Sequence, residues 1–343
     1  MENYFFFILI LSVVATVCNG EGSISYDWTA NVTVAQDGSG NYRTISDALN
    51  SVVDNSDFKF FIHVKAGVYT EHVVISEKKR NVVMFGDGSD KTVISGSLNR
   101  IDQPKMKTYQ TATFSVLGDG FVGRDMKFVN DAGSKKEQAV AFHSKSNQSA
   151  MYKCVFDGNQ DTLYVHAGQQ LYQECDIIGT IDFIFGSGLA VFQNCSIQLR
   201  DPFPKPYDTV TAHAGLGHQE KSGFSIIGCS IMPFMGIPFT RGTAYLGRPW
   251  NGTATVVVMK TSIGKIIDPK GWVQWNSNTP TPPTVTFGEY QNSGEGSSVS
   301  QRVSWKGYNR QMTDQEALMY TIGVFINQNG WLKTTCVPFV IGL

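Results

Sequence analysis

The stretch LYQECDIIG, Leu171–Gly179, recurs in varied form along the chain. It has aromatic or apolar residues shortly before a cysteine and further apolar residues shortly after it. The same pattern surrounds five other positions, which are Met126, Cys154, Cys195, Cys229 and Thr261. Cys154, Cys175 and Cys195 follow one another at nearly equal steps, and the steps before and after these three are longer. A period of about 20 residues with loop insertions indicates a solenoid.

The repeated unit predicts an all-β fold. Its residues are mainly Val, Ile, Phe and Tyr, in short runs punctuated by Gly and Asn, which favours strands and turns over helices. We therefore expect a parallel β-helix, in which equivalent residues of successive coils stack about 4.8 Å apart. A leucine-rich-repeat array or a propeller is the alternative, but the leucine and Trp-Asp signatures of those arrays are missing from the sequence.

A helix is expected to cap the N-terminal end of this solenoid. The stretch TISDALNSVV, Thr44–Val53, places its apolar residues, Val53 included, on one helical face. Thr44 and Asp47 have the spacing of a capping box, in which the two side chains satisfy backbone N–H groups at the start of a helix.

The N-terminus and the composition predict a secreted protein. Met1–Gly20 has an apolar core too short to span a bilayer, followed by small residues, which is typical of a secretory signal peptide although it holds no Lys or Arg. We expect residues 21–343 to form a single domain. Without Met1–Gly20, which contains Glu2, 28 basic residues balance 28 acidic ones. This balance gives no reason to expect nucleic acid as a partner, and no other run is long enough for a membrane anchor.

Five cysteines remain after such a cleavage, so at least one has no partner within the chain. Cys175 and Cys195 should lie on adjacent coils, and the strand spacing falls within the Cα separation of a disulfide. We expect a bond between them, with Cys154 as the competing partner, and we expect Cys336 to be unpaired. Four N-glycosylation triplets fit a secreted protein, at Asn31, Asn147, Asn194 and Asn251.

Two aspartates in apolar surroundings are the main candidates for chemistry. Asp161 in GNQDTLY and Asp182 in GTIDFIFG each follow a cysteine of the repeat by seven residues, so their side chains should be neighbours on consecutive coils. Two carboxylic acids at so short a distance do not ionise equally easily. One would stay a carboxylate while the other donates a proton. A hydrogen-bonded ladder or a calcium site is the alternative.

Other polar residues favour the catalytic interpretation. Gln138 precedes Gln160 by about one coil, and stacked amides can donate N–H groups to a developing oxyanion. A calcium site would instead need more carboxylates. In YLGRPW, Arg248 can hold a carboxylate ionised, and Trp250 can stack on a sugar ring.

Several other chemistries lack their signatures. The chain has no Gly-x-Ser-x-Gly elbow, and its histidines and cysteines show neither His-Glu-x-x-His nor Cys-x-x-Cys spacing. The glycine-rich stretches QDGSGNY and GDGSDK lack the Gly-Lys-Ser/Thr ending of a phosphate loop. We therefore expect no metal and no other cofactor.

From about Val34 to the C-terminus the sequence resembles the plant pectin methylesterases, or pectinesterases. The motifs that carry the resemblance stand in the family's order, and they are GVYTEHVVI, TATF, QAVAF, GNQDTLYVH, GTIDFIFG, YLGRPW and WLKTTCVPF. The resemblance implies a right-handed parallel β-helix that hydrolyses the C6 methyl esters of homogalacturonan, releasing methanol and leaving pectate. The short interval between Gly20 and Val34 implies a form without the inhibitor-like pro-region that many members carry.

The resemblance also implies roles for the matching residues. Asp182 would be the nucleophile, and Asp161 would be the acid for the leaving methanol and then the base for water. Gln160 and Gln138 would donate to the oxyanion, and Arg248 would hold the nucleophile. Trp250 and Thr108 would contact the sugar. The expected partners are pectin and, as a possible second one, a proteinaceous pectinesterase inhibitor. We expect a monomer in the cell wall.

Two other functions remain open at this point. A chain-cleaving pectin enzyme, either a lyase or a polygalacturonase, could use the same solenoid. A lyase would carry a calcium-binding aspartate cluster. A relative without catalytic activity is the other alternative, which the intact Asp161, Asp182, Gln160 and Arg248 argue against. Asn159, where an aromatic residue usually precedes Gln-Asp-Thr, and NGTA after Trp250 depart from the family pattern and could alter a substrate subsite.

Overall fold

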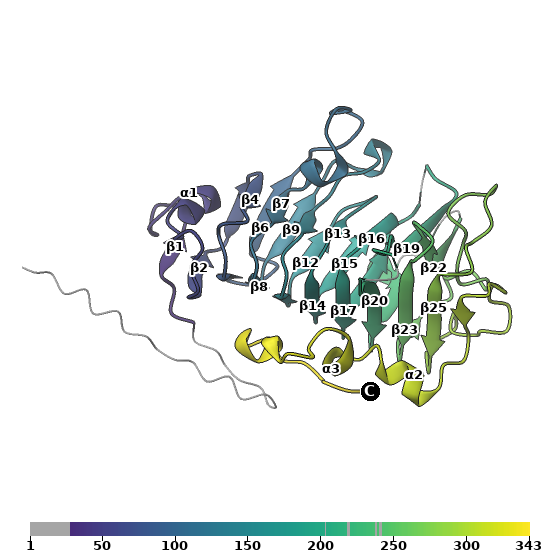
Figure 1. Cartoon of the computed structure of the whole chain (residues 1–343). Helices are drawn as coiled ribbons and strands as arrows, with labels where there is room; N and C mark the ends of the chain where they lie inside the picture. Colours follow the sequence, from purple (N-terminus) through teal and green to yellow (C-terminus); the bar gives the residue numbers. More distant parts are fainter. Residues whose placement is uncertain (1–27, 203, 218–219, 237–238, 240–241) are drawn as a thin grey trace, which may run out of the picture.

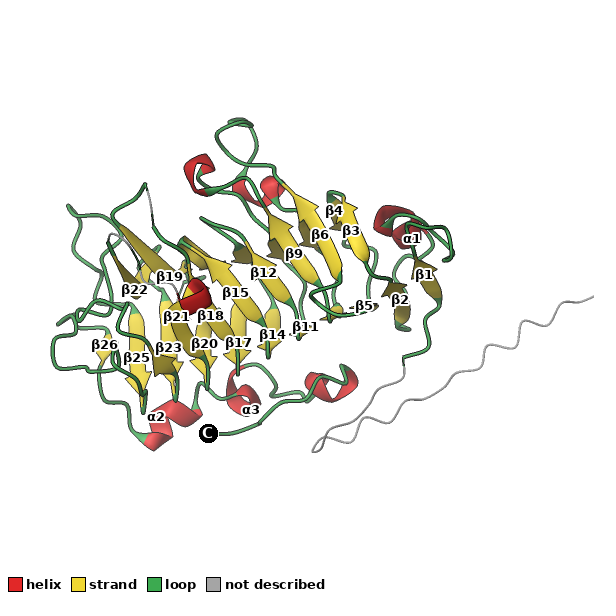
Figure 2. Ribbon diagram, turned by 180° about the vertical axis from the view of Figure 1, so that it is seen from behind, coloured by secondary structure: helices red, strands yellow, loops and turns green. Residues whose placement is uncertain are grey.

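The computed structural model describes residues 28–202, 204–217, 220–236, 239 and 242–343. The signal peptide expected at Met1–Gly20 lies outside these residues. Figures 1 and 2 show strands stacked side by side along one axis, in an elongated body built of successive coils. No helix in the described part of the chain is long and apolar enough to cross a membrane.

Three parallel sheets run along this body. The eleven-stranded sheet contains, in spatial order, β1 (Val32–Val34), β2 (Phe60–Val64), β5 (Val82–Gly86), β8 (Val122–Arg124), β11 (Ser149–Tyr152), β14 (Gln169–Gln173), β17 (Leu189–Gln193), β20 (Gly223–Ile227), β23 (Thr255–Met259), β25 (Thr286–Tyr290) and β26 (Tyr308–Asn309). The eight-stranded sheet contains β24 (Ser262–Ile263), β21 (Ser230–Pro233), β18 (Ser196–Leu199), β15 (Asp176–Gly179), β12 (Val155–Asp157), β9 (Lys127–Asn130), β6 (Thr92–Gly96) and β3 (Gly67–Thr70). The seven-stranded sheet contains β22 (Thr243–Pro249), β19 (Tyr207–His213), β16 (Ile181–Gly186), β13 (Leu163–Val165), β10 (Phe142–Ser144), β7 (Phe114–Val116) and β4 (Val73–Ile75). The expected parallel β-helix is therefore confirmed.

The register of the eight-stranded sheet confirms the repeat found in the sequence. Asp176 pairs with Val155 on one side and with Ser196 on the other, and Ser196 pairs with Ser230. The cysteines that precede these residues therefore form one stack. Inside the coils the aromatic residues stack in the same way, as in Phe128 against Phe156, whose ring centroids lie 5.7 Å apart. Repetition of one apolar pattern thus produces a continuous core.

A left-handed residue stands immediately before each position of the cysteine stack. The backbone angle φ is +51° at Lys153, +52° at Glu174 and +55° at Asn194. These residues form the bend between the eleven-stranded and eight-stranded sheets. The left-handed conformation costs most residue types about 1–2 kcal/mol. Hydrogen bonds between coils offset this cost, since Lys153 N donates to Gln173 O at 3.1 Å and Glu174 N to Gln193 O at 3.0 Å.

The predicted disulfide between Cys175 and Cys195 is wrong, because both thiols are free and buried. The Cys175 thiol donates to Gln173 O at 3.4 Å, and the Cys195 thiol to Tyr172 O at 3.3 Å. Equivalent side chains of stacked parallel strands point the same way. Their Cβ atoms thus stay about 4.8 Å apart, beyond the 3.5–4.5 Å that a disulfide needs. Cys336, expected to be unpaired, is disulfide-bonded instead.

The N-terminal capping helix is confirmed as α1 (Ile45–Asn50), shorter than predicted. The Thr44 hydroxyl accepts from Asp47 N at 3.1 Å, and it donates to the Asp47 carboxylate at 2.6 Å. The helix ends before Val53, which is 68% exposed and contributes nothing to the apolar face. The Glu71 carboxylate accepts from the N–H groups of Ile45 and Ser46, an arrangement that the positive end of a helix favours.

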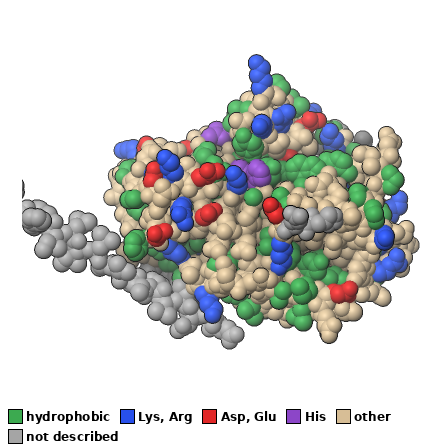
Figure 3. Space-filling model, in the orientation of Figure 1, with side chains coloured by type: hydrophobic (Ala, Val, Ile, Leu, Met, Phe, Trp, Pro, Cys, Tyr) green, Lys and Arg blue, Asp and Glu red, His purple; other side chains and the backbone are tan. Residues whose placement is uncertain are grey.

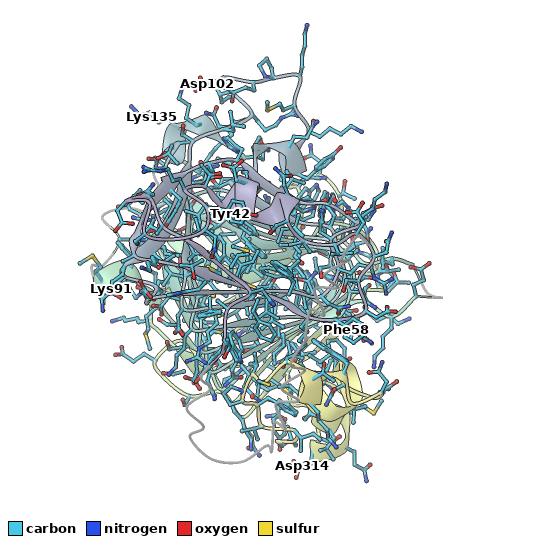
Figure 4. The ribbon with its side chains drawn as sticks, turned by 90° about the vertical axis from the view of Figure 1, so that its left-hand side faces the viewer. Tyr42, Phe58, Lys91, Asp102, Lys135 and Asp314 are labelled. Atoms are coloured by element: carbon cyan, nitrogen blue, oxygen red, sulfur yellow. The ribbon has the colours of Figure 1, made fainter. Side chains whose placement is uncertain are left out.

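The C-terminal segment crosses the outer face of the eleven-stranded sheet. It contains α2 (Asp314–Leu318), α3 (Ile322–Phe325) and the 3₁₀ helix η4 (Trp331–Thr334). Other 3₁₀ helices lie in loops, and they are η1 (Thr108–Thr111), η2 (Ser134–Lys136) and η3 (Phe234–Gly236). In the view along the solenoid, Asp102 and Lys135 mark two loops at the top and Asp314 marks the C-terminal segment at the bottom (Figure 4). One flank of the body is thus covered by the end of the chain, and the loops rise from the other.

Candidate active site

A single row of in-register side chains lies along the seven-stranded sheet. The register pairs one residue of each strand with the next, in the order Val74, Ser115, His143, Tyr164, Phe185, Ala212 and Arg248. Two neighbouring cavities of about 460 and 500 Å³ open over this row and share Tyr109. The row therefore forms the floor of an elongated groove.

The first cavity, which we term the acidic pocket, contains every catalytic and substrate-binding residue expected from the sequence. Its 460 Å³ are lined by Lys107, Thr108, Tyr109, Gln138, Gln160, Asp161, Tyr164, Asp182, Phe185, Ala212, Arg248, Trp250 and Trp275. These residues lie far apart in the chain, from Lys107 at one extreme to Trp275 at the other. The coils bring them together because each contributes one strand to the same sheet.

Asp161 lies in the tight turn between β12 and β13. Leu163 of β13 pairs with Ile184 of β16, and Asp161 and Asp182 each precede one of these partners by two positions. Asp161 N donates to Ile181 O at 3.1 Å, so the turn is bound to the next coil. The φ of Asp161 is +65°, a conformation that few non-glycine residues adopt. The turn is thus held in one strained conformation by its neighbours.

Asp182 lies on a β-bulge. The register between β16 and β19 shifts between Ile181 and Ile184, and Asp182 within the bulge has a φ of +53°. Bulges re-aim side chains and are common beside active sites. Thr209 fixes the residue from the next coil, since its hydroxyl accepts from Asp182 N at 2.9 Å and donates to Asp182 Oδ1 at 2.5 Å.

Arg248 holds the Asp182 carboxylate with both arms of its guanidinium. Nε donates to Oδ1 at 2.8 Å and Nη2 donates to Oδ2 at 2.6 Å, so the pair is bidentate and largely buried. The guanidinium also lies over the Trp275 ring, 4.3 Å from its centroid. Burial alone would lower the pKa of Arg248, but its bonds to Asp182 outweigh burial and raise that pKa above its ordinary value. The arginine thus remains charged.

The two carboxyl groups have different environments. Arg248 bonds Asp182 and not Asp161, and burial raises the pKa of the Asp161 carboxyl well above the ordinary value. The charge of Asp182 raises this pKa further, and that of Arg248 lowers it in part. The pocket therefore favours a protonated Asp161 beside a carboxylate bound by Arg248. In the described residues no three His, Cys, Asp or Glu side chains are grouped to hold a metal, so the calcium alternative lacks a ligand set there.

Two side-chain amides border the same space. Ala139 N donates to Gln160 O at 3.2 Å, which ties Gln138 and Gln160 to adjacent coils as the sequence spacing predicted. Both side chains are half-buried and line the acidic pocket. Neither amide group has a hydrogen-bond partner among the described residues, so each keeps its N–H donors for a bound molecule.

A sequence profile of one family, described as Pectinesterase, matches residues 31–329. The chain belongs to the pectinesterase family. It is 45% identical over 313 residues to Pectinesterase 3 of Phaseolus vulgaris, covering 91% of this chain and 53% of that protein. It is 44% identical over 307 residues to Pectinesterase 1 of Arabidopsis thaliana, covering 90% and 52%. The chain thus spans about half the length of these curated relatives.

Solved pectin methylesterases share the fold of this pectinesterase-family chain. The carrot enzyme has a TM-score of 0.88 at 40% identity, covering 93% of this chain and 100% of the carrot chain. The Aspergillus niger enzyme in deglycosylated form has a TM-score of 0.76 at 28% identity, covering 91% and 97%. These likenesses confirm the right-handed parallel β-helix expected from the sequence.

The sequence patterns did not indicate Thr209, which bonds Asp182, or Trp275 and Tyr109, which line the acidic pocket. Thr209 reads as an ordinary strand residue, and its bonds to Asp182 follow only from the bulge. Trp275 stacks on Trp250 with 6.3 Å between ring centroids, and Tyr109 stands between the two cavities. Trp250 and Trp275 are separated by roughly one coil in the sequence, which was a usable signal for their contact.

Proposed function

We propose that this chain hydrolyses the C6 methyl esters of pectin, releasing methanol and leaving a free carboxylate. The observation that carries the proposal is the contrast between Asp182, gripped by Arg248 and Thr209, and the buried Asp161 beside it. One group is supplied as an anion and the other with a proton, which is what acyl transfer from an ester to a carboxylate requires. We take residues 21–343 as one catalytic domain.

In the first half of the reaction, an Asp182 carboxylate oxygen attacks the ester carbonyl carbon. The electron pair of the C=O bond moves onto its oxygen, and the amide N–H groups of Gln138 and Gln160 stabilise the resulting oxyanion. As the oxyanion collapses, the bond to the methoxy oxygen breaks and Asp161 gives its proton to that oxygen. Methanol leaves, and the uronate acyl group remains on Asp182 as an anhydride.

In the second half, water replaces the enzyme on the acyl group. Asp161, now ionised, takes a proton from water as the oxygen attacks the acyl carbon. The bond to Asp182 breaks, and its carboxylate returns to the guanidinium of Arg248. The product acid then loses its proton to solvent, and both aspartates are in their starting forms.

The substrate is proposed to lie along the groove. Trp250 and Trp275 offer aromatic faces in the acidic pocket, which Thr108 also lines, and such faces suit the apolar side of a sugar ring. A pectin methylesterase of 25% identity has been solved in complex with a hexasaccharide. An elongated site of this kind suits a polymer more than a single sugar.

The location and the partners are also proposals. We propose secretion to the cell wall, action as a monomer and N-glycosylation, which the exposure of all four acceptor asparagines supports, at Asn31, Asn147, Asn194 and Asn251. Figure 3 shows acidic and basic side chains interspersed over the visible face, which suits a balanced net charge. Arabidopsis relatives named pectinesterase/pectinesterase inhibitor make an inhibitor protein the natural second partner to test.

The test is methanol release from highly esterified pectin by the purified protein and two variants. Asp182→Asn removes the nucleophile with little change in shape and should reduce the rate by at least about 10³-fold, in line with loss of an essential group. Asp161→Asn should lose about 10²–10⁴-fold, because it lacks the acid and the base, and it should accumulate an acyl adduct detectable by mass spectrometry. Asp57→Asn, at an exposed position, is the control and should match the parent.

Two results would refute the proposal. One is near-parent methanol release by the Asp182→Asn variant. The other is the appearance of new chain ends without methanol, which would show a lyase or a polygalacturonase instead.

A further inference from the structure

The second cavity of the groove has no role in the chemistry above. We term it the histidine pocket, because His72, His143 and His166 all line its 500 Å³. It lies over β10, β7 and β4, whereas Asp182 lies on β16. In the strand order, β10 and β7 are two and three spacings from β16, or about 10 and about 14 Å. A ligand that reaches from Asp182 into this pocket must therefore be longer than one sugar.

The floor of the histidine pocket is a chain of hydrogen bonds. His143 is 2% exposed, and its Nδ1 lies 3.2 Å from Ser115 Oγ while its Nε2 lies 2.9 Å from His166 Nδ1. Two rings joined through one proton cannot both be protonated at the shared bond. Burial lowers the pKa of His143 to about 3, helped by the charges of His166 and Lys145, and burial and Lys145 also lower that of His166. This floor is therefore uncharged at neutral pH.

The charged groups at the rim cancel one another. Lys145 Nζ lies 3.3 Å from Glu77 Oε1, so the lysine that lines the pocket already has a carboxylate partner. His72 Nδ1 lies 3.2 Å from the carbonyl oxygen of Ala112, which it bonds as a donor. An incoming carboxylate would gain no unpaired cation from these lining residues, and it would approach Glu77.

The walls are aliphatic. They are formed by Val74, Leu98, Ala112 and Leu117, and Val74 is 59% exposed at the start of the row of side chains. Such walls favour a methyl group over a charged oxygen, because the carboxylate would lose hydration without a partner. The acidic pocket, in contrast, has a charged arginine and the two aspartates.

We propose that the histidine pocket binds a methylesterified galacturonate unit of the same polymer whose reacting ester lies over Asp182, and that it selects the ester over the free acid. This inference rests on the proposed function. Its consequence is that the chain acts on esters that have an esterified neighbour at a fixed distance along the polymer. Stretches that already carry free carboxylates at that distance are then poor substrates.

The experiment compares two oligogalacturonates of equal length, one fully methylesterified and one with half of its esters removed at random. The measured quantity is kcat/KM for methanol release per remaining ester. We expect the fully esterified oligomer to be preferred at least about tenfold. Glu77→Gln removes the negative charge and frees Lys145 for a carboxylate, so it should reduce this preference by about fivefold.

The matched control is Glu174→Gln. Glu174 forms a similar exposed pair with Lys153, at 3.9 Å, on the bend that leads into the eight-stranded sheet, so this variant should keep the parent's preference. Equal rates on both oligomers, a preference for the half-esterified one, or a Glu77→Gln variant that behaves like the control would each overturn the inference while methanol release upholds the proposed function. No methanol from either oligomer would instead refute the proposed function itself.

Discussion

At the scale of single residues, two aspartates at equivalent positions of adjacent coils acquire opposite properties. Both have left-handed backbone conformations and both are buried. Asp182 is bonded by a guanidinium and a hydroxyl, whereas Asp161 is buried beside the charge of Asp182 and is not bonded by Arg248. The neighbours, and not the residue type, thus decide which carboxyl keeps a proton.

A third aspartate, Asp208, is buried away from the two that line the acidic pocket. Asp208 lies on β19 next to Thr209, it is 0% exposed, and neither carboxyl oxygen has a hydrogen-bond partner among the described residues. Burial raises the pKa of Asp208 to about 9, and the charges of Asp201 and Asp182 contribute. The folded protein therefore holds a proton on Asp208 at neutral pH.

This proton predicts a loss of stability as pH rises. The unfolded chain releases the proton near 3.8, whereas the fold keeps it up to about 9, so the folded state binds more protons between these values. The free energy of unfolding should thus fall with rising pH across that window, by on the order of 1 kcal/mol per pH unit. Asp208→Asn removes the titration and should make the protein more stable at pH 8, measured by chemical denaturation at pH 5 and pH 8.

The exposed Asp57→Asn substitution is the control for this prediction and should leave the pH dependence of the parent. If Asp208→Asn shows the same pH dependence as the parent, the unpaired buried carboxyl is not its source.

At the scale of elements, the last coils depend on a buried ion pair. Glu289 on β25 accepts from Arg302 Nε at 2.8 Å, from Trp272 Nε1 at 3.2 Å and from the Tyr308 hydroxyl at 2.8 Å. Arg302 also donates to the carbonyl oxygen of Gly296 at 2.8 Å. The bonded residues come from different segments of the chain. The network therefore holds together the loops at the C-terminal end of the solenoid.

Removal of one partner of the Glu289–Arg302 ion pair should therefore strongly reduce the free energy of unfolding. Arg302→Ala leaves the Glu289 carboxylate buried without its cation and should reduce the free energy of unfolding by about 3–5 kcal/mol, measured by denaturant titration. The comparison is Lys205→Ala, which breaks the exposed pair with Glu137 and should cost less than about 1 kcal/mol. Similar losses in the two variants would show that the buried network is not special.

At the scale of the whole molecule, the end of the chain protects a long sheet face. Trp331, Leu332 and Val337 pack in one buried cluster with Leu171 and Val191 of the eleven-stranded sheet. We term this C-terminal segment, residues 314–343, the strap. Near its C-terminal end, the Gln193 side chain donates to Val340 O at 3.0 Å and accepts from Val340 N at 2.8 Å. An uncovered apolar sheet face is prone to association, so the strap serves solubility as well as stability.

The strap predicts that its tryptophan matters far more than its exposed residues. Trp331→Ala opens a cavity between strap and sheet and should cost about 3–5 kcal/mol, seen as a lower unfolding midpoint and a greater tendency to aggregate. Val340→Ala keeps the backbone bonds to Gln193 and trims a side chain that is 56% exposed, so it should cost less than about 1 kcal/mol. Equal effects would mean that the strap is held by its backbone alone.

Much of the fold was predictable from the sequence, because a solenoid repeats one local solution. The aligned stack from Met126 to Thr261, the parallel strands and the N-terminal helix all follow from patterns within about one coil. The disulfide prediction, which was wrong, also rested on a spacing of about one coil. Cys175 and Cys195 have the right spacing for a disulfide, but the parallel direction of their side chains depends on how the coils stack.

The sequence by itself determined which residues meet in the acidic pocket, since Gln138, Gln160, Asp161 and Asp182 are related by the period of the coil. Only the tertiary structure decided the direction, burial and protonation of their side chains. The bulge that turns Asp182 toward Thr209, the uncharged histidine pair and the unpaired Asp208 depend on contacts between coils. Periodicity fixes which residues are neighbours, but burial, side-chain direction and charge are properties of the packed surroundings, and a one-dimensional pattern does not contain them.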